Sequence, residues 1–482
     1  MATRFRGVVT TGIYCRDGCP AQPKQDNVRA YDFAAAAEAE GFRPCLRCRP
    51  DRAPDWPDWL GPSQLVCRSL HLISQGALDD AGVDDLATRL GVGSRHLRRL
   101  FDVHVGASPV AIARSRRAHF ARRLLDETDL SITQIAFAAG FSSVRQFNRT
   151  VLEVFRYPPT GLRQRRRRDD PIQSDGGLSV RLVYQPPLDW TTMVGYLAAR
   201  ATPGVESVDD RSYRRTIDWD GTAGVLELRP DRRASHLILT VHLPEFAGLI
   251  HVVEQARRVF DLGADVVTIG RALRRDPMLA PLVRARPGLR VPGGWDPFEI
   301  AVRAVLGQQV SVAAATNLAG KVAAAFGTSI ASGDGALTRL FPSPELLADA
   351  DLASVGMPAV RADAVRGLAA AVASGDLALD GARGLDALVV DLVRLRGIGP
   401  WTAQYIAMRA CGEPDALPAG DLGLRRAAGG GEPLSTDALE QRAEAWRPWR
   451  AYAAMHLWAA PLPRRVSGNG QTKTGDRVTT GA

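Results

Sequence analysis

The chain has 482 residues, 45% of them hydrophobic, and a formal net charge of +9. No stretch approaches the ~18 uninterrupted apolar residues of a membrane-spanning helix, and the segment MATRFRGVVTTG lacks the apolar core of a secretion signal. We therefore expect a cytoplasmic, nucleoid-associated protein with no membrane partner, built from domains of roughly 100–200 residues each.

Positive charge is concentrated in the first third of the chain. Residues 1–168 hold 27 Lys or Arg against 17 Asp or Glu, whereas the remainder holds 34 against 35. A basic segment joined to a near-neutral one indicates a polyanionic partner, although a solvated basic surface gives the same count. We expect the first segment to bind a polyanion.

Composition divides the chain into successive segments. A Cys-rich segment ends in the Pro-punctuated stretch DRAPDWPDWLGP, and helical periodicity then continues to RQRRRRDD. The runs VLELRP and HLILTVHL predict strands and accompany a helical run, MVGYLAARA. Strands cluster without βα alternation, which argues against a doubly wound sheet. The predicted segments are a Cys-rich domain (1–60), an all-α domain (63–168), a linker (169–177), a small antiparallel sheet-and-helix domain (178–250), a second all-α domain (251–465) and a disordered polar tail (466–482).

Four cysteines occur in two close pairs. Cys15 and Cys19 form a C-x3-C pair, and Cys45 and Cys48 form a C-x2-C pair after 25 intervening residues. Each pair can supply adjacent vertices of a tetrahedral site, so the spacing predicts that the four cysteines bind Zn²⁺. Two disulfides are the alternative, which a reducing compartment disfavours.

The residues around these cysteines, TTGIYCRDGCP and FRPCLRCRPD, resemble the N-terminal domain of the Ada family of alkylation-response regulators. The resemblance implies that Cys15 accepts a methyl group from a DNA methylphosphotriester while remaining one of the zinc ligands. Zinc keeps a bound sulfur as thiolate, which is a nucleophile. Methylating one thiolate removes a negative charge, which favours binding to DNA phosphates. Arg47 and Arg16 are the candidate phosphate contacts, whereas PAQPKQD lacks the arginines expected after Cys19.

Residues 63–168 contain two similar helical units. The stretch VDDLATRLGVGSRHLRRLFDVHVG predicts a helix, a Gly-containing turn and a second helix that begins near Ser94, and ITQIAFAAGFSSVRQFNRTVLEVF repeats this pattern. A plain helical bundle with a basic face is the alternative. Together with ASPVAIARSRRAHFARRLLDETDL, these units resemble the AraC-type DNA-binding domain, and the Ada family joins the same two blocks in the same order. The side chains expected to reach a major groove are Arg95, His96 and Arg99 in the first unit and Arg145, Gln146 and Arg149 in the second.

A Gly-Ile-Gly turn in LVRLRGIGPWTAQYIAMRA lies between two apolar helical runs, roughly 385–395 and 401–410. Gly397 and Gly399 permit a tight turn whose backbone N–H groups can hold a DNA phosphate. Asp421 lies 22 residues beyond Gly399, in LPAGDLGLRRA. Capping of the following helix is the alternative role for this aspartate.

These elements resemble the helix-hairpin-helix DNA glycosylases, and residues 180–460 more closely resemble AlkA-type 3-methyladenine DNA glycosylase II. Supporting stretches are YQPPLDWTTMVGYLAARATPGVESV, FEIAVRAVLGQQVSVAAA and WRPWRAYAAMHLW. The resemblance implies that Asp421 stabilises oxocarbenium character at C1′ and orients water. It also implies a pocket in which aromatic faces bind a flipped, cationic methylpurine. The pocket residues are Tyr196, Trp401, Tyr405 and Trp458.

Three positions depart from the pattern of that family. Gln309 stands where the family carries an apolar wedge that fills the gap left by the flipped base, and a glutamine can also plug this gap. Leu422 follows the aspartate where a tyrosine can occur. Trp401 occupies the place of the Schiff-base lysine of bifunctional relatives, so we expect a monofunctional hydrolase without lyase activity.

The combined prediction is a multidomain α+β protein that fuses a zinc-containing, methyl-accepting transcription activator to a glycosylase for 3-methyladenine and 7-methylguanine. Its expected partners are damaged duplex DNA, a promoter operator and RNA polymerase. No Pro-Cys-His-Arg motif occurs, so the O6-alkylguanine transfer domain of the Ada family is replaced. Two alternatives remain: a pure DNA-binding regulator with a degenerate glycosylase half, and a repair enzyme whose helix-turn-helix units only raise non-specific affinity.

Overall fold

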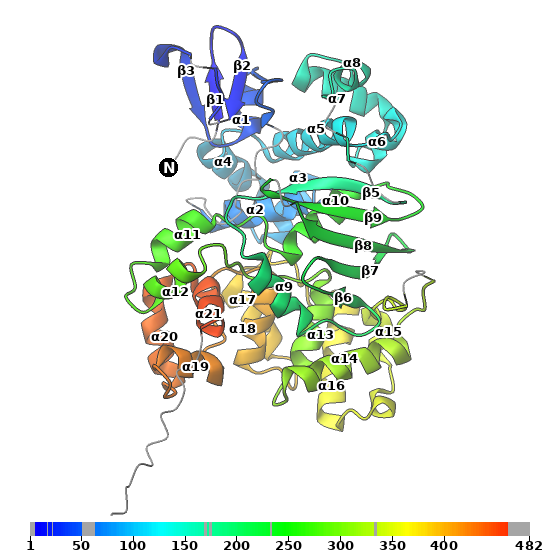
Figure 1. The fold of residues 1–482 in the computed structure, drawn as a ribbon, viewed down its shortest axis with the longest axis vertical. Helices are drawn as coiled ribbons and strands as arrows, with labels where there is room; N and C mark the ends of the chain where they lie inside the picture. Colours follow the sequence, from blue (N-terminus) through cyan, green and yellow to red (C-terminus); the bar gives the residue numbers. More distant parts are fainter. Residues whose placement is uncertain are drawn as a thin grey trace, which may run out of the picture.

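The computed structural model describes residues 5–16, 18–21, 23–50, 63–167, 171–172, 176–231, 234–331 and 335–460. The predicted tail, 466–482, and part of the predicted linker, 169–177, lie outside the described residues. No helix within the described ranges is long and apolar enough to cross a membrane. In Figure 1 the N-terminal third forms the upper part of the molecule, a five-stranded sheet lies below it, and the C-terminal helices lie lowest.

The N-terminal elements form a small four-stranded sheet in the order β3-β1-β2-β4. Neighbouring strands are antiparallel, except that β2 and β4 are parallel. The turn between β1 and β2 ends at Gly12, whose φ of 61° is a conformation that favours glycine. The elements are β1 (Phe5–Val8), β2 (Ile13–Arg16), η1 (Gln25–Asn27), β3 (Val28–Tyr31), α1 (Ala34–Ala39) and β4 (Arg43–Pro44).

Seven helices follow, and they contain both predicted helix-turn-helix units. The second helix of the first unit begins at Ser94, as predicted. Side chains at the helix starts explain several boundaries: Ser131 and Gln134 form a capping box, and Ser143 accepts from the backbone N–H of Gln146. The helices are α2 (Gln64–Ser74), α3 (Val83–Arg89), α4 (Ser94–His104), α5 (Pro109–Glu127), α6 (Ile132–Ala138), α7 (Val144–Phe155) and α8 (Pro159–Arg163).

The second sheet has five antiparallel strands in the order β5-β9-β8-β7-β6, which confirms the predicted antiparallel sheet. Leu226 and Leu228 alternate along β8, and Leu237 and Leu239 alternate along β9; all four are fully buried on one face. The elements are β5 (Leu178–Val183), α9 (Trp190–Ala198), β6 (Glu206–Val208), β7 (Tyr213–Trp219), β8 (Thr222–Pro230) and β9 (His236–His242).

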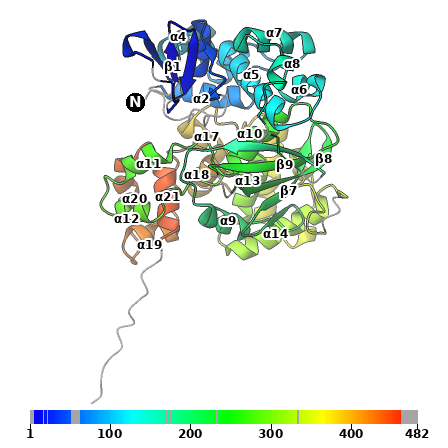
Figure 2. The ribbon, with the colours of Figure 1, turned by 45° about the horizontal axis from the view of Figure 1, so that its top comes forward.

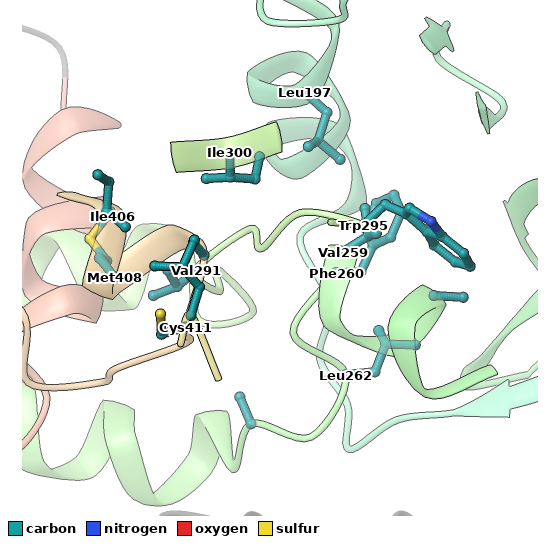
Figure 3. Packing of buried hydrophobic residues seen from close by; sticks show 14 of the residues in the cluster. Leu197, Val259, Phe260, Leu262, Val291, Trp295, Ile300, Ile406, Met408 and Cys411 are labelled. Carbon is teal, nitrogen blue, oxygen red and sulfur yellow. The ribbon is translucent and has the colours of Figure 1, made fainter. Parts of the chain in front are cut away.

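The remaining elements are helical and share a hydrophobic core with the sheet. Figure 3 shows part of this core, where Ile406 and Met408 lie near Val291. The elements are α10 (Leu249–Val259), α11 (Val266–Leu273), α12 (Leu279–Ala285), α13 (Pro297–Leu306), α14 (Val312–Phe326), α15 (Pro344–Ala348), η3 (Leu352–Val355), α16 (Ala359–Ala373), α17 (Leu385–Val393), α18 (Pro400–Arg409), α19 (Leu422–Ala428), α20 (Thr436–Ala443), η4 (Glu444–Trp446) and α21 (Arg450–Trp458).

A buried ion network fixes the sheet to α13. Arg215 on β7 contacts Glu299 at 2.8 Å, and Arg303 contacts both Glu299 and Glu206 at 2.9 Å. Two cations face two anions, so each buried charge has a partner that offsets its desolvation. Arg303 also donates to the carbonyl of Arg200, just beyond α9. This network therefore sets the position of α9 against α13.

Polar contacts join the N-terminal sheet to α5, which lies beside it (Figure 2). Arg49 forms a buried ion pair with Asp126 of α5. Glu38 accepts a hydrogen bond from Tyr14 at 2.8 Å and lies 2.7 Å from His119 of α5. The small sheet is thus held to the helix that connects the two helix-turn-helix units.

A second set of contacts joins this helical segment to the C-terminal half. Asp79 contacts Arg117 at 2.5 Å and His251 of α10 at 2.6 Å. Arg116 of α5 lies 3.5 Å from Glu254, which also belongs to α10. Buried apolar residues of α5 and of α10 also belong to one hydrophobic cluster, so polar contacts and apolar packing together join the two halves of the chain.

Candidate functional site

The four predicted zinc ligands lie together. Parallel pairing of β2 with β4 places Tyr14 opposite Pro44, and the Cys45 N–H donates to the Tyr14 carbonyl at 2.9 Å. The adjacent Cys15 and Cys45 are therefore neighbours, and Cys19 and Cys48 complete the cluster. All four sulfur atoms lie within 4.8 Å of one another, and none is in a disulfide. Zn–S bonds of ~2.3 Å in a tetrahedron require sulfur separations of about 3.8 Å, so this set fits one Zn²⁺.

Arginines surround the cysteine cluster in two different environments. Arg16 and Arg47 are exposed beside it. The carbonyl of Arg47 accepts from Arg167 at 3.0 Å, which ties this turn to the segment after α8. Arg49 is buried in its pair with Asp126 and was missed in the sequence, because only the fold brings its partner close. The exposed arginines can contact a phosphate, whereas the buried one connects the cluster to α5.

The predicted groove-facing residues lie at the start of the second helix of each unit. Arg95, His96 and Arg99 are exposed on α4, with Arg99 3.2 Å from the His96 ring. On α7, the amide oxygen of Gln146 accepts from the Ser142 hydroxyl at 3.0 Å. The amide NH₂ of Gln146 therefore remains for another contact. The remaining predicted positions of α7, both exposed, are Arg145 and Arg149.

A cavity of about 1170 Å³ opens among α9, α13, α14, α18 and α21. It brings together residues that are far apart in the sequence. The predicted residues that line it are Tyr196, Gln309, Gly397, Gly399, Trp401, Tyr405, Asp421 and Trp458.

Asp421 both caps a helix and lines this cavity. One of its carboxylate oxygens accepts from the Leu424 N–H at 2.8 Å and from the Trp458 indole N–H at 3.0 Å. The capping alternative is therefore present together with the cavity position. A Cβ at residue 423 would lie 2.9 Å from the same oxygen, so Gly423 permits the carboxylate to reach the indole. These contacts fix the orientation of the carboxylate.

The aromatic residues form a connected wall. Trp401 stacks on Tyr405 with ring centroids 5.5 Å apart and an interplanar angle of 17°, and Trp458 meets Tyr405 at 64° and 6.3 Å. Two guanidinium groups lie over the ring of Tyr196, that of Arg200 at 3.7 Å and that of Arg409 at 4.7 Å. A base stacking on Tyr196 would compete with these groups, whereas Trp401 and Trp458 carry no such cover among the described residues.

Arg409 is a cavity residue that the sequence reasoning missed. It is 3% exposed and donates to the hydroxyl of Tyr405 at 2.8 Å and to that of Tyr196. Its position four residues after Tyr405 on α18 was the available signal. Burial would raise the pKa of Tyr405, but the positive charges of Arg409 and Arg200 outweigh it and lower this pKa to about 8. Burial raises the pKa of Tyr196 to about 12.

The Gly-Ile-Gly turn joins α17 to α18 and borders the cavity. Gly397 has a φ of 88°, and a Cβ there would lie 2.7 Å from the Cβ of Ala364, so this position requires glycine. Gly399 caps α18. Gln308, a further residue missed in the sequence, donates to the Gly397 carbonyl and the Thr402 hydroxyl, both at 2.9 Å. Its neighbour Gln309 is exposed at the cavity and has a φ of 56°.

Family models match four consecutive parts of the chain. They confirm the predicted resemblances, and the cysteine cluster together with the first match supports Zn²⁺ as the bound metal. The matches are the metal binding domain of Ada (3–51), a helix-turn-helix domain (86–165), the AlkA N-terminal domain (179–296) and the HhH-GPD superfamily of base excision DNA repair proteins (302–451).

Similar proteins agree with this order of domains. A probable bifunctional transcriptional activator/DNA repair enzyme AlkA from Mycobacterium tuberculosis is 44% identical over 94% of this chain and 91% of that protein. DNA-3-methyladenine glycosylase 2 from Escherichia coli is 38% identical over 58% of this chain and 95% of that protein. The structure of a 3-methyladenine DNA-glycosylase from Archaeoglobus fulgidus covers 58% of this chain and 97% of its own, with a TM-score of 0.51 and 23% identity, and shares the fold. The chain therefore belongs to the family of bifunctional transcriptional activator/DNA repair enzymes AlkA, with an Ada-like and a glycosylase half.

Proposed function

We propose that the C-terminal half hydrolyses the glycosidic bond of alkylated purines such as 3-methyladenine and 7-methylguanine. The observation that carries this proposal is Asp421, held by Leu424 and Trp458 in an aromatic-lined cavity. As the bond between C1′ and the base breaks, its electron pair leaves with the base. The carboxylate stabilises the positive charge that develops on the sugar and accepts a proton from the attacking water.

The other cavity residues position the substrate in this proposal. A methylpurine cation stacks on Trp401, whose far side is supported by Tyr405. Backbone N–H groups near Gly399, at the start of α18, hold a DNA phosphate. Gln309, exposed at the cavity, fills the gap left by the flipped nucleotide.

The residues that line the cavity support hydrolysis without strand cleavage. They include no lysine that could form a Schiff base with the sugar, and Trp401 stands at the position expected for one. A labelled duplex with a single 7-methylguanine tests this point. Release of the base should leave an abasic strand that breaks only after alkali, whereas breakage without alkali would contradict a monofunctional enzyme.

We further propose that Cys15 accepts a methyl group from a DNA methylphosphotriester. The sulfur attacks the methyl carbon, an S–C bond forms, the C–O bond breaks, and the phosphodiester anion leaves. Bound Zn²⁺ keeps the cysteine sulfurs as thiolates at neutral pH. The exposed side chains of Arg16 and Arg47 lie where they can bring the phosphate to the cluster.

Methylation of Cys15 is proposed to activate sequence-specific binding to a promoter and contact with RNA polymerase. Support comes from the exposed residues of α4 and α7 and from the polar contacts that tie the small sheet to α5. Footprinting of the protein before and after methylation tests this. A protected operator that appears only after methylation is expected. Protection without sequence preference would favour a repair enzyme whose helix-turn-helix units only raise non-specific affinity, and a Cys15→Ala variant that still responds to methylation would contradict the switch.

A further inference from the structure

Two adjacent glutamines lie in the segment 307–311, which connects α13 to α14, and their environments differ. Gln309 is exposed at the cavity and has a φ of 56°, in the left-handed region that residues other than glycine rarely adopt. Gln308 is half-buried and hydrogen-bonded to other parts of the protein. A strained backbone conformation persists only where the surrounding structure enforces it. The contacts of Gln308 show how this segment is held.

The side-chain amide of Gln308 ties this segment to the Gly-Ile-Gly turn. Its nitrogen donates to the Gly397 carbonyl and to the Thr402 hydroxyl, both at 2.9 Å. A carbonyl oxygen cannot donate, so the nitrogen of the amide, and not its oxygen, faces Gly397. Both amide protons are therefore used, one just before α18 and one in its first turn.

Arg361 holds the main chain of the same residue. From the first turn of α16, its guanidinium donates to the Gln308 carbonyl at 2.7 Å. Further along this helix Ala364 lies against the Gly-Ile-Gly turn, because a Cβ on Gly397 would lie 2.7 Å from the Cβ of Ala364. Residues at positions i and i+3 share a helix face. One face of α16 therefore supports both the segment that carries Gln309 and the turn before α18.

We propose that Gln308 is a positioning residue that holds the wedge at Gln309 in place for extrusion of the damaged nucleotide. The proposal rests on the glycosylase function proposed above, in which Gln309 fills the gap left by the flipped base. The Gln308 carbonyl lies in the planar peptide that leads into Gln309, so its bond to Arg361 fixes one side of the strained φ. The Gln308 amide fixes the wedge relative to the turn that holds a DNA phosphate. Because the wedge and the turn are held together before DNA binds, little ordering entropy is lost on extrusion.

This role concerns extrusion of the nucleotide and not the breaking of the glycosidic bond. Gln308 lines the cavity, but its two amide protons are engaged by the protein. An unpaired base costs less to extrude than a paired one. Loss of the Gln308 amide should therefore slow release strongly from a base pair and weakly from an unpaired base. A defect in bond cleavage would slow both equally.

The test measures single-turnover release of 7-methylguanine by the full chain from two duplexes. In one the base pairs with cytosine, and in the other it belongs to a one-nucleotide bulge and has no partner. Gln308→Met keeps the length of the side chain and removes the amide. Loss of two hydrogen bonds should slow release from the paired duplex by about 30-fold and from the bulge by at most about 3-fold. Gln255→Met is the matched control, because Gln255 is a half-buried glutamine of α10 that does not line the cavity, and it should change neither rate.

Two results would overturn this role of Gln308. Equal slowing on both duplexes in Gln308→Met would indicate a defect in bond cleavage or in the fold, and unchanged release from the paired duplex would show that the wedge does not depend on the amide. Release from the bulge that stays near the original rate shows that the variant is folded. If the unaltered protein releases no 7-methylguanine from either duplex, the proposed glycosylase function itself fails, which a loss confined to the variant does not imply.

Discussion

Replacing Asp421 by asparagine changes the charge of the cavity while keeping its shape. An asparagine oxygen can still accept from the Leu424 N–H and the Trp458 indole, the two donors that hold the carboxylate. The cap of α19 is therefore kept, and the loss of the negative charge is the main perturbation. A change in rate then reports the electrostatic contribution of the carboxylate rather than a loss of fold.

The size of the effect follows from Coulomb attraction in a partly exposed site. Asp421 is neither fully buried nor fully exposed, so an effective dielectric constant of about 20 applies, and opposite charges about 4 Å apart attract by about 4 kcal/mol. Losing this attraction in the transition state slows the reaction roughly 10³-fold. Binding of the damaged duplex should change little, because the charge on the sugar develops only in the transition state.

The assay is single-turnover release of 7-methylguanine from a duplex that carries one such base. Asp265→Asn is the matched control: Asp265 caps α11 by accepting from the Thr268 N–H at 3.0 Å, and it does not line the cavity. We expect the rate to fall only in Asp421→Asn, with both variants unfolding at the temperature of the unaltered protein. An Asp421→Asn rate within a few-fold of the original would refute the catalytic role and favour the regulator with a degenerate glycosylase half.

Further predictions concern the metal, the buried charges and the DNA contacts. Chelating Zn²⁺ should unfold the small sheet, seen as loss of amide protection over residues 5–50, whereas protection of the C-terminal half persists. Arg303→Met leaves Glu206 and Glu299 with an uncompensated charge and should lower the free energy of unfolding in urea by about 3–5 kcal/mol. Burial raises the pKa of Glu413 to about 7, so the folded protein holds a proton that the unfolded chain loses, and stability falls as the pH rises from the ordinary glutamate pKa to about 7. Glu413→Gln should remove this fall and raise the unfolding free energy at pH 8 by up to about 3 kcal/mol in the same urea experiment. Arg99→Ala should weaken operator binding and reduce its salt dependence by about one counterion if Arg99 contacts a phosphate, or relax specificity at one base pair if it contacts a base.

Local sequence patterns predicted the parts of the molecule that depend on neighbours in the chain. The cysteine spacing predicted one cluster because each pair spans a short turn and cannot separate widely. The glycines of the Gly-Ile-Gly stretch predicted a tight turn. Gly397 has a positive φ, which glycine adopts without the steric cost that other residues would have. The helix beginning at Ser94 follows for the same reason, since its start is set by the Gly-containing turn before it.

Contacts between distant segments could not be predicted in this way. Arg409 donates a hydrogen bond to Tyr196, which lies 213 residues earlier in the chain. The helical periodicity around each residue does not indicate that the two side chains meet. Arginine side chains usually lie on the surface, yet Arg49 is buried against α5, where it forms an ion pair with Asp126. Asp421 shows a further limit, because the capping pattern was correct and still did not decide whether the carboxylate also lines a cavity.

The central claim is that one chain performs a catalytic excision and a single, self-consuming methyl transfer. Incubating the protein with an excess of methylated duplex DNA tests both, if free methylpurine is measured by chromatography and methylation of the Cys15 peptide by mass spectrometry over one time course. Released base should exceed the amount of protein and keep rising, while methyl on Cys15 stops at one group per chain. Base release that never exceeds the amount of protein, or a Cys15 that stays unmodified, would contradict the account.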